Sequence, residues 1–156
     1  MNQLSFALGA IAAGFCIAMQ APANSRLRAN LGADGLHHFH HSLYAAFFSI
    51  CGTFLSITAV MLVIRPTTPS LASIRQAEWW NWIGGPLGAL FVFAGAILIN
   101  RLGAALFVSL VVGGQLFCSL VLDHFGLLGL PQQSMTPTRV LGALLVVAGV
   151  VCLKYL

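Results

Sequence analysis

Strongly polar side chains are rare in this chain, so each one that falls inside an apolar run is a candidate for chemistry. The chain has 156 residues, of which 59% are hydrophobic and only 6% are charged. Gln115 lies in the middle of the apolar run Leu102–Leu122, beside Gly113-Gly114. A polar residue inside a membrane helix is costly and is by default a candidate for a functional site. The amide can hydrogen-bond either a substrate or a neighbouring helix, and both interpretations stay open.

Polar and aromatic residues near the ends of two other apolar runs extend this candidate site. Gln20 and Asn24 flank Pro22 and are either interfacial residues or part of a cavity lining. The segment Trp79–Trp82 holds three tryptophans, which is typical of the aromatic belt at a membrane interface. Tryptophans can also stack on an organic substrate, and apolar walls with a few polar anchors are typical of small-molecule sites. We therefore predict a substrate-binding set of Gln20, Asn24, Trp80, Trp82 and Gln115, with no cofactor.

Asp123 is one of only three acids and the only one that adjoins an apolar run. It is a candidate for coupling transport to an ion, because ionisable groups in membrane bundles often mark ion pathways. We favour a structural role, in which Asp123 ends its helix and pairs with a loop group such as Arg139 or His124. With so few acids, a neutral or weakly charged metabolite fits the sequence better than an organic cation. Arg26 or Arg101 could admit an anion.

Four histidines fall within five residues, in the run His37-His38-Phe39-His40-His41. Neutral imidazole is the commonest metal ligand in proteins. On a helix, His37 would share a face with His40 and His41. No cysteine and no acid other than Asp34 is near in sequence to complete a site. We therefore interpret the run as a solvated or interfacial loop and predict no metal site, with His37, His38, His40 and His41 as the alternative.

The remaining composition excludes several function classes. The four cysteines lie singly in four different apolar runs, so neither a zinc site nor a disulfide framework is indicated. The formal net charge of +4 is spread over the segment ends, which is typical of membrane flanks and not of a nucleic-acid interface. No nucleophile–base pair and no phosphate-cradling glycine loop is visible. We predict a membrane protein that is not an enzyme and binds no nucleic acid.

Five apolar runs are long enough to cross a hydrocarbon core of about 30 Å as helices of about 20 residues. Because the backbone must satisfy its own hydrogen bonds in lipid, we predict an all-α, polytopic membrane protein. The first run could be a secretory signal peptide, since Ala21-Pro22-Ala23 would suit cleavage. However, no Lys or Arg precedes it, so we predict a retained helix. The five predicted transmembrane helices are 4–21, 43–64, 82–99, 102–122 and 138–156, in a single membrane domain of residues 1–156.

Positive charges are almost evenly divided between the two sides of the membrane that these helices imply. Orientation in the membrane follows the Lys/Arg bias between short loops, and three charges against four is almost no bias. Such a chain can insert in both orientations, and two copies could then pair antiparallel. The N-terminal side holds Arg65, Arg75 and Arg139, and the other side holds Arg26, Arg28, Arg101 and Lys154.

Three segments resemble the YdcZ-like family of five-helix proteins in the drug/metabolite transporter superfamily. They are QAPANSRL at Gln20–Leu27, WWNWIGGPLGALFV at Trp79–Val92, and NRLGAALFVSLVVGGQLFCSLVLDHFGLLGLP at Asn100–Pro131. The last three helices are more distantly similar to those of the small multidrug resistance proteins, although no apolar run holds the central glutamate of that family. The segment LHHFHHS at Leu36–Ser42 departs from the family pattern. The resemblance implies a small-molecule transporter that acts as a paired or fused bundle.

Together these features predict a transporter of the drug/metabolite type in the cell inner (plasma) membrane. Its pocket would lie between two antiparallel protomers and work by alternating access, for which inverted repeats are suited. The predicted partners are a small organic metabolite or drug-like substrate, the lipid bilayer and a second copy of the chain. Two alternatives stay open. One is a non-transporting membrane assembly subunit, and the other is a metal-handling membrane protein that uses the run His37–His41.

Overall fold

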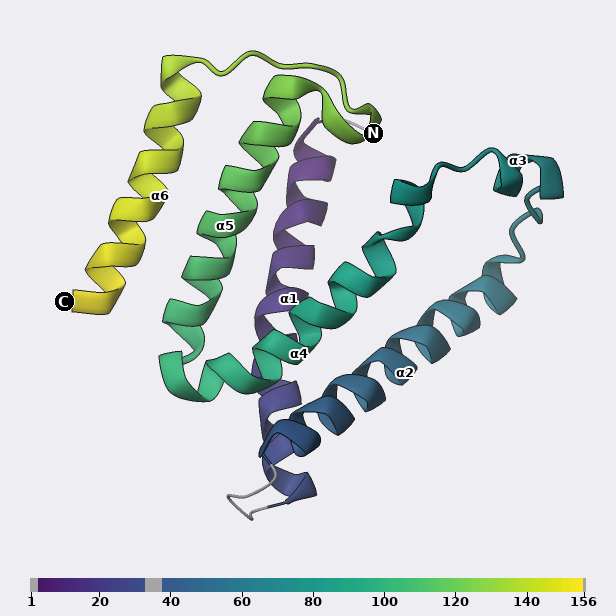
Figure 1. Ribbon diagram of the computed structural model, residues 1–156, viewed down its shortest axis with the longest axis horizontal. Helices are drawn as coiled ribbons and strands as arrows, with labels where there is room; N and C mark the ends of the chain where they lie inside the picture. The colour runs from purple at the N-terminus through teal and green to yellow at the C-terminus, as the bar shows by residue number, and fades with distance from the viewer. Residues whose placement is uncertain (1–2, 33–37, 156) are drawn as a thin grey trace. The chain divides into compact units, whose positions relative to one another are not determined.

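The computed structural model describes residues 3–32 and 38–155, and this part of the chain is helical without strands (Figure 1). Within it, five helices are long and apolar enough to cross a membrane, which confirms the predicted all-α class with five spans. Three short helices lie in the connections: α3 (Leu71–Arg75), η2 (Trp79–Trp82) and η3 (Leu127–Gly129). The long helices are α1 (Gln3–Leu31), α2 (His38–Ile64), α4 (Gly84–Leu102), α5 (Ala104–Phe125) and α6 (Pro137–Tyr155).

The first two helices extend well into residues 22–42, which the predicted helix bounds of 4–21 and 43–64 leave as a polar connection. The prediction that the first helix ends at residue 21 is wrong, because α1 continues through Pro22 to Leu31. Likewise α2 begins at His38 and not at residue 43. A proline inside a membrane helix is tolerated where neighbouring groups satisfy the freed backbone. The extension packs against α2, and Ser25 on it is buried and hydrogen-bonded to Asn100.

The other three long helices begin and end within three residues of the predicted positions. Glycine fixes two of these boundaries. Gly103, the single residue between α4 and α5, has a φ of 78°, and Gly126 ends α5 with a φ of 60°. Both angles lie in the region that side chains with a Cβ disfavour, so glycine suits these turns.

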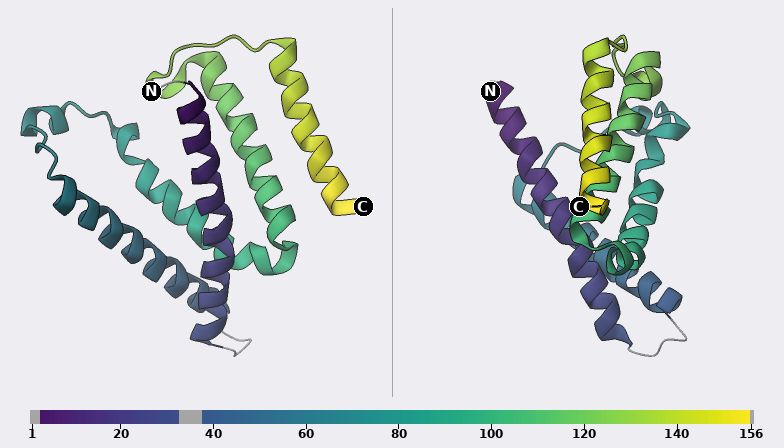
Figure 2. Two further views of the ribbon diagram at one scale, coloured as in Figure 1. Left: turned by 180° about the vertical axis from the view of Figure 1, so that it is seen from behind. Right: turned by 90° about the vertical axis from the view of Figure 1, so that its left-hand side faces the viewer.

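The chain forms two compact units, residues 1–100 and 101–156, and each is described by itself. In the first unit, the C-terminal part of α1 packs against the N-terminal part of α2 (Figures 1 and 2). The buried residues are mostly small, and small residues let membrane helices approach backbone to backbone. A single membrane domain of residues 1–156 stays a prediction. The buried residues of the first unit are Ala21, Asn24 and Ser25 on α1, Ser42, Ala45 and Ala46 on α2, and Gly95, Ala96 and Ile99 on α4.

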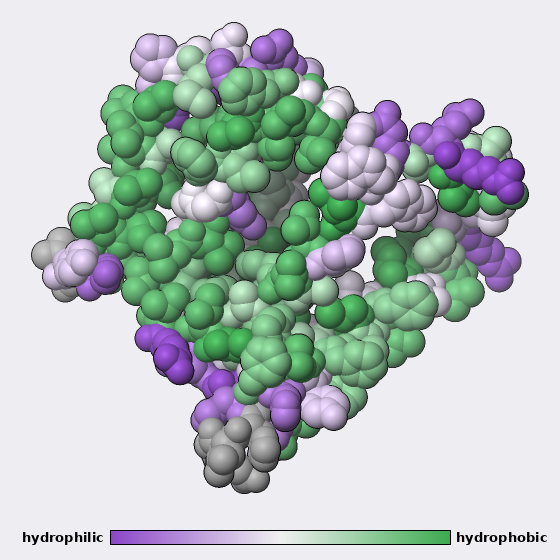
Figure 3. Space-filling view, viewed as in Figure 1, coloured by the Kyte–Doolittle hydropathy of each residue, from purple (hydrophilic) through white to green (hydrophobic). Residues whose placement is uncertain are grey.

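In the second unit, α5 and α6 lie side by side and antiparallel (Figures 1 and 2). They are joined by η3 and the extended segment 130–136. Along α6, which the structure describes from Pro137 to Tyr155, no residue is buried. Apolar residues cover most of the surface visible in Figure 3. Apolar helices that expose their side chains in this way are suited to contact with lipid or with further helices.

Candidate functional site

The first unit buries three polar side chains where α1, α2 and α4 supply its core. Asn24, Ser25 and Ser42 are 6%, 4% and 0% exposed. The Oγ of Ser42 donates to the carbonyl oxygen of His38 at 2.8 Å, and the Oγ of Ser25 donates to the Oδ1 of Asn100 at 2.6 Å. The Nδ2 of Asn24 has no hydrogen-bond partner among the described residues. Because a buried, unsatisfied donor costs about 1–3 kcal/mol, this amide is the strongest candidate for ligand contact.

The spacing of α1 explains why these groups face the same way. Residues three and four apart are neighbours on a helix surface. Gln20 and Arg28 therefore lie one turn to either side of Asn24, and both are half-buried. The Nε of Arg28 is also buried without a hydrogen-bond partner among the described residues. Pro22, on the same helix, has no N–H, so the carbonyl of Ala18 loses its usual intrahelical donor.

The structure places the predicted substrate-binding residues in both units. Gln20 is half-buried and Asn24 is buried, both on α1. Trp80 is half-buried and Trp82 is 60% exposed, both in η2. Gln115 is exposed on α5, in the second unit. A pocket that unites all five residues therefore stays a prediction.

Asp123 and His124 fasten the connection between α5 and α6. The Oδ2 of Asp123 lies 3.3 Å from the Nη2 of Arg139, which confirms the predicted pairing of these residues. The main-chain carbonyl of Asp123 also accepts a hydrogen bond from the backbone N–H of Gln133 at 2.8 Å. The Nδ1 of His124 accepts from the backbone N–H of Met135 at 3.3 Å. These contacts give Asp123 a structural role, and a role in ion coupling stays a prediction.

The histidine run is helical where the structure describes it, which differs from the predicted loop. His38, His40 and His41 lie in the first turn of α2, and His37 lies outside the described residues. Within the described ranges, no group of three or more His, Cys, Asp or Glu side chains is placed to hold a metal ion. His40 instead lines a cavity of about 620 Å³ together with three apolar or aromatic residues of α2, namely Leu43, Tyr44 and Phe47.

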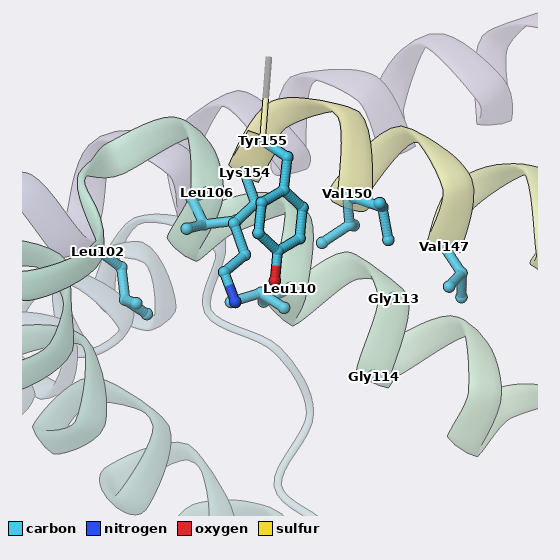
Figure 4. Close-up of a pocket in the computed structure, with 10 residues that line it drawn as sticks. Leu102, Leu106, Leu110, Gly113, Gly114, Val147, Val150, Lys154 and Tyr155 are labelled. Carbon is cyan, nitrogen blue, oxygen red and sulfur yellow. The ribbon is translucent and has the colours of Figure 1, made fainter.

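A groove along α5 and α6 was not predicted from the sequence. It has a volume of about 460 Å³, and Gly113 and Gly114 form part of its floor. Figure 4 shows the side chains of Lys154 and Tyr155 between Leu102 at one end of the groove and Val147 at the other. The Nζ of Lys154 lies 4.8 Å from the centre of the Tyr155 ring. The groove is thus lined mainly by apolar residues, together with the amine of Lys154. Its remaining lining residues are Leu106, Leu110, Val150 and Val151.

The chain is similar in sequence to a family of inner membrane proteins. The family described as "Putative inner membrane exporter, YdcZ" matches residues 5–152. The chain belongs to the YdcZ family. A relative in Escherichia coli (strain K12), the inner membrane protein YdcZ, is 36% identical over 76 residues, which is 49% of this chain and 50% of that protein. The match thus spans about half the length of this curated relative. No solved structure matches the chain.

Membership confirms the resemblance seen in the sequence and makes the chain a multi-pass protein of the inner membrane. The family's description as an exporter indicates a transporter and points away from an enzyme. Two of the segments that carry the resemblance meet in the structure. Ser25 belongs to QAPANSRL and Asn100 begins NRLG, and the hydrogen bond between their side chains joins the two segments.

Proposed function

We propose that this YdcZ family protein moves a small organic molecule across the inner membrane by alternating access, in a pocket between two antiparallel copies. The observation that carries the proposal is Asn24, which is 6% exposed on a membrane helix and has no partner for its Nδ2 among the described residues. A buried polar group without a hydrogen-bond partner on a membrane helix is a default candidate for a transport site. Pro22 lies inside the same helix and leaves the carbonyl of Ala18 without its usual intrahelical donor, so this carbonyl is a further polar group near Asn24.

Open helix faces support the pairing of two copies. A Cβ added at Gly9, Gly14, Gly113, Gly142 or Gly149 would meet nothing within 4 Å in the described part of the chain. Glycine faces of this kind allow another helix to approach closely in lipid. The balance of three positive charges against four supports insertion in both orientations, because orientation follows the Lys/Arg bias.

The proposed pocket combines apolar walls with a few hydrogen-bonding groups. Apolar surface supplies affinity and sparse polar anchors fix the orientation of a small ligand. Asn24 is the most buried of these anchors, and the tryptophans of η2 offer flat surfaces for an organic substrate. The pocket residues are Gln20, Asn24, Trp80, Trp82 and Gln115.

Replacement of Gln115 by Leu in the reconstituted dimer tests this function. Leu has a similar volume but no hydrogen-bonding group. If Gln115 anchors the substrate, counterflow of a panel of labelled metabolites in proteoliposomes should fall while the dimer stays intact. If Gln115 instead bridges helices, the dimer should weaken by about 1 kcal/mol, which is typical of interhelical hydrogen bonds in membranes.

The wild-type protein supplies the decisive control. Saturable counterflow of at least one metabolite by the purified dimer is expected. If proteoliposomes with copies in both orientations move no member of the panel, the transport proposal is wrong and an assembly subunit is favoured.

A further inference from the structure

Two buried N–H donors without partners lie one turn apart on α1. They are the Nδ2 of Asn24 and the Nε of Arg28, and neither has a hydrogen-bond partner in the part of the chain that the structure describes. Residues four apart are adjacent on one helix face, so one ligand group can reach both donors. Arg26 lies between them in sequence but is exposed. The pair is therefore a feature of the packed face of α1 and not of its basic end as a whole.

The chemistry of the pair selects its ligand. An amide NH₂ and a guanidinium N–H can only donate hydrogen bonds. A guanidinium also keeps its positive charge under all ordinary conditions, and Arg28 is half-buried, so an anion that reaches its Nε would also compensate that charge. A carboxylate or phosphate supplies acceptor oxygens and a compensating negative charge together. The planar guanidinium also matches the geometry of both oxyanions.

The described chain contains two acids, and neither pairs with Arg28. The carboxylate of Asp123 pairs with Arg139 in the second unit. Glu78 is exposed and immediately precedes η2. Neither of these two described carboxylates forms an ion pair with Arg28. A negatively charged ligand would therefore not have to displace them.

We propose that Asn24 and Arg28 bind the oxyanion of the transported molecule, so that the substrate is a small organic carboxylate or phosphate. The proposal rests on the transport function given above and adds Arg28 to its site. Gln20, which is half-buried one turn before Asn24, lies where it can contact the rest of such a molecule.

Binding is measured by calorimetry on the dimer in nanodiscs of phosphatidylcholine. The probes are succinate, benzoate and inorganic phosphate, with glycerol and tetraethylammonium as neutral and cationic controls. At least one anion should bind saturably at millimolar concentration, and the controls should not. Asn24→Leu and Arg28→Gln should each weaken binding by about tenfold or more, because each removes a hydrogen bond to a charged group. Arg75→Gln makes the same charge change on the exposed helix α3 and should leave binding unchanged.

The stability of the ligand-free variants gives an independent measurement. Because Asn24→Leu removes a buried donor that has no partner, the variant should unfold at a temperature no lower than that of the wild type. A lower unfolding temperature together with unchanged anion binding would show that the amide is bonded in the assembled protein, and would overturn the proposal.

Other outcomes also decide against it. If none of the three anions binds, or if the controls bind as well as the anions, the substrate assignment is wrong. Nanodiscs that contain phosphatidylglycerol distinguish a lipid phosphate from a solute. Stabilisation by this lipid that depends on Arg28, without binding of soluble anions, would assign the pair to a lipid headgroup and overturn the substrate proposal.

The same variants separate this proposal from the transport function. Saturable anion binding that depends on Arg28, in a protein that transports nothing, would refute transport and retain the oxyanion site. Transport of neutral metabolites that is unaffected by Arg28→Gln would refute the site and leave transport standing.

Discussion

Replacement of Asp123 by Asn tests whether this carboxylate holds the second unit together or couples transport to an ion. The Oδ2 of Asp123 lies 3.3 Å from the Nη2 of Arg139, and the two side chains are 29% and 32% exposed. Partly exposed ion pairs contribute about 0.2–1 kcal/mol. The Nη1 of Arg139 is already buried without a hydrogen-bond partner in the described chain. Loss of the carboxylate would also remove the negatively charged partner of this guanidinium. We expect a cost near the top of that range, about 1 kcal/mol.

Part of the connection should survive the substitution. The hydrogen bond from the backbone N–H of Gln133 to the carbonyl of Asp123, at 2.8 Å, does not involve the side chain. Arg139 also keeps its hydrogen bond to the Oε1 of Gln133. The second unit should therefore be weakened but not unfolded.

A double-mutant cycle isolates the ion pair. Asp123→Asn, Arg139→Gln and the double variant are compared by reversible unfolding in mixed micelles, followed by circular dichroism. The coupling energy should be about 0.5–1 kcal/mol, because the residues are in direct contact. Arg75→Gln makes the same charge change on exposed α3 and serves as the control, with no coupling to Asp123 expected.

Two results would refute this reasoning. If the costs of the single substitutions add in the double variant, the ion pair contributes nothing to stability. If Asp123→Asn leaves stability unchanged but abolishes transport driven by an ion gradient, Asp123 is a coupling residue and not a structural one.

Three further predictions follow from other parts of the chain. Ser25→Ala removes the 2.6 Å hydrogen bond to α4 and should lower the free energy of unfolding in micelles by about 1 kcal/mol, whereas an unchanged value would show that the bond is not needed. One variant combines Thr67→Lys, Thr68→Lys and Lys154→Gln, which changes the balance of positive charges to five on the N-terminal side against three. A second variant combines Ala29→Lys and Asn30→Lys, which changes the balance to three against six. The two variants should insert in opposite orientations and restore transport only when they are co-expressed. A wild-type C-terminal tag that always reports one compartment contradicts dual topology. Replacement of the four histidines at 37–41 by Asn should leave dimer formation and transport intact, and a large loss rescued by a transition metal would contradict this.

The sequence predicted the long helices well because membrane spans carry a strong signal. An uninterrupted apolar run can satisfy its backbone in lipid only as a helix or in a barrel, so its length and position are easily recognised. Gly103 and Gly126 then end helices where a positive φ is needed. The prediction failed at the end of α1, because Asn24, Ser25 and Arg28 were interpreted as loop residues. Packing against α2 and the hydrogen bond from Ser25 to Asn100 stabilise a helix that local composition does not indicate.

The same error explains which site residues were found and which were missed. Asn24 was predicted because it lies beside Pro22, whereas Arg28 was assigned to the polar connection. Once α1 is extended, Gln20, Asn24 and Arg28 are spaced four residues apart and therefore share one face of the helix, which would have identified Arg28 as a site residue. Gln115 shows a different limit. Its position in the middle of a run predicts depth in the membrane, but only packing decides which way a side chain faces, and Gln115 is exposed.

The two units use different interactions, and the difference bears on how the protein can work. Lipid gives no hydrophobic driving force between helices, so their association depends on close packing and hydrogen bonds. The first unit has both, in small buried residues such as Ala45 and Ala96 and in the bond from Ser25 to Asn100. In the second unit, the ion pair between Asp123 and Arg139 joins α5 to α6 near one end of each helix. The glycine faces along α5 and α6 have no side chain packed against them in the described chain. In the proposed function, Asn24 and Arg28 of the first unit bind the substrate, and the open glycine faces of both units are surface for assembly. Substitutions at Asn24 or Arg28 should therefore alter binding before they alter dimer formation, and substitutions at Gly113 or Gly149 should do the reverse.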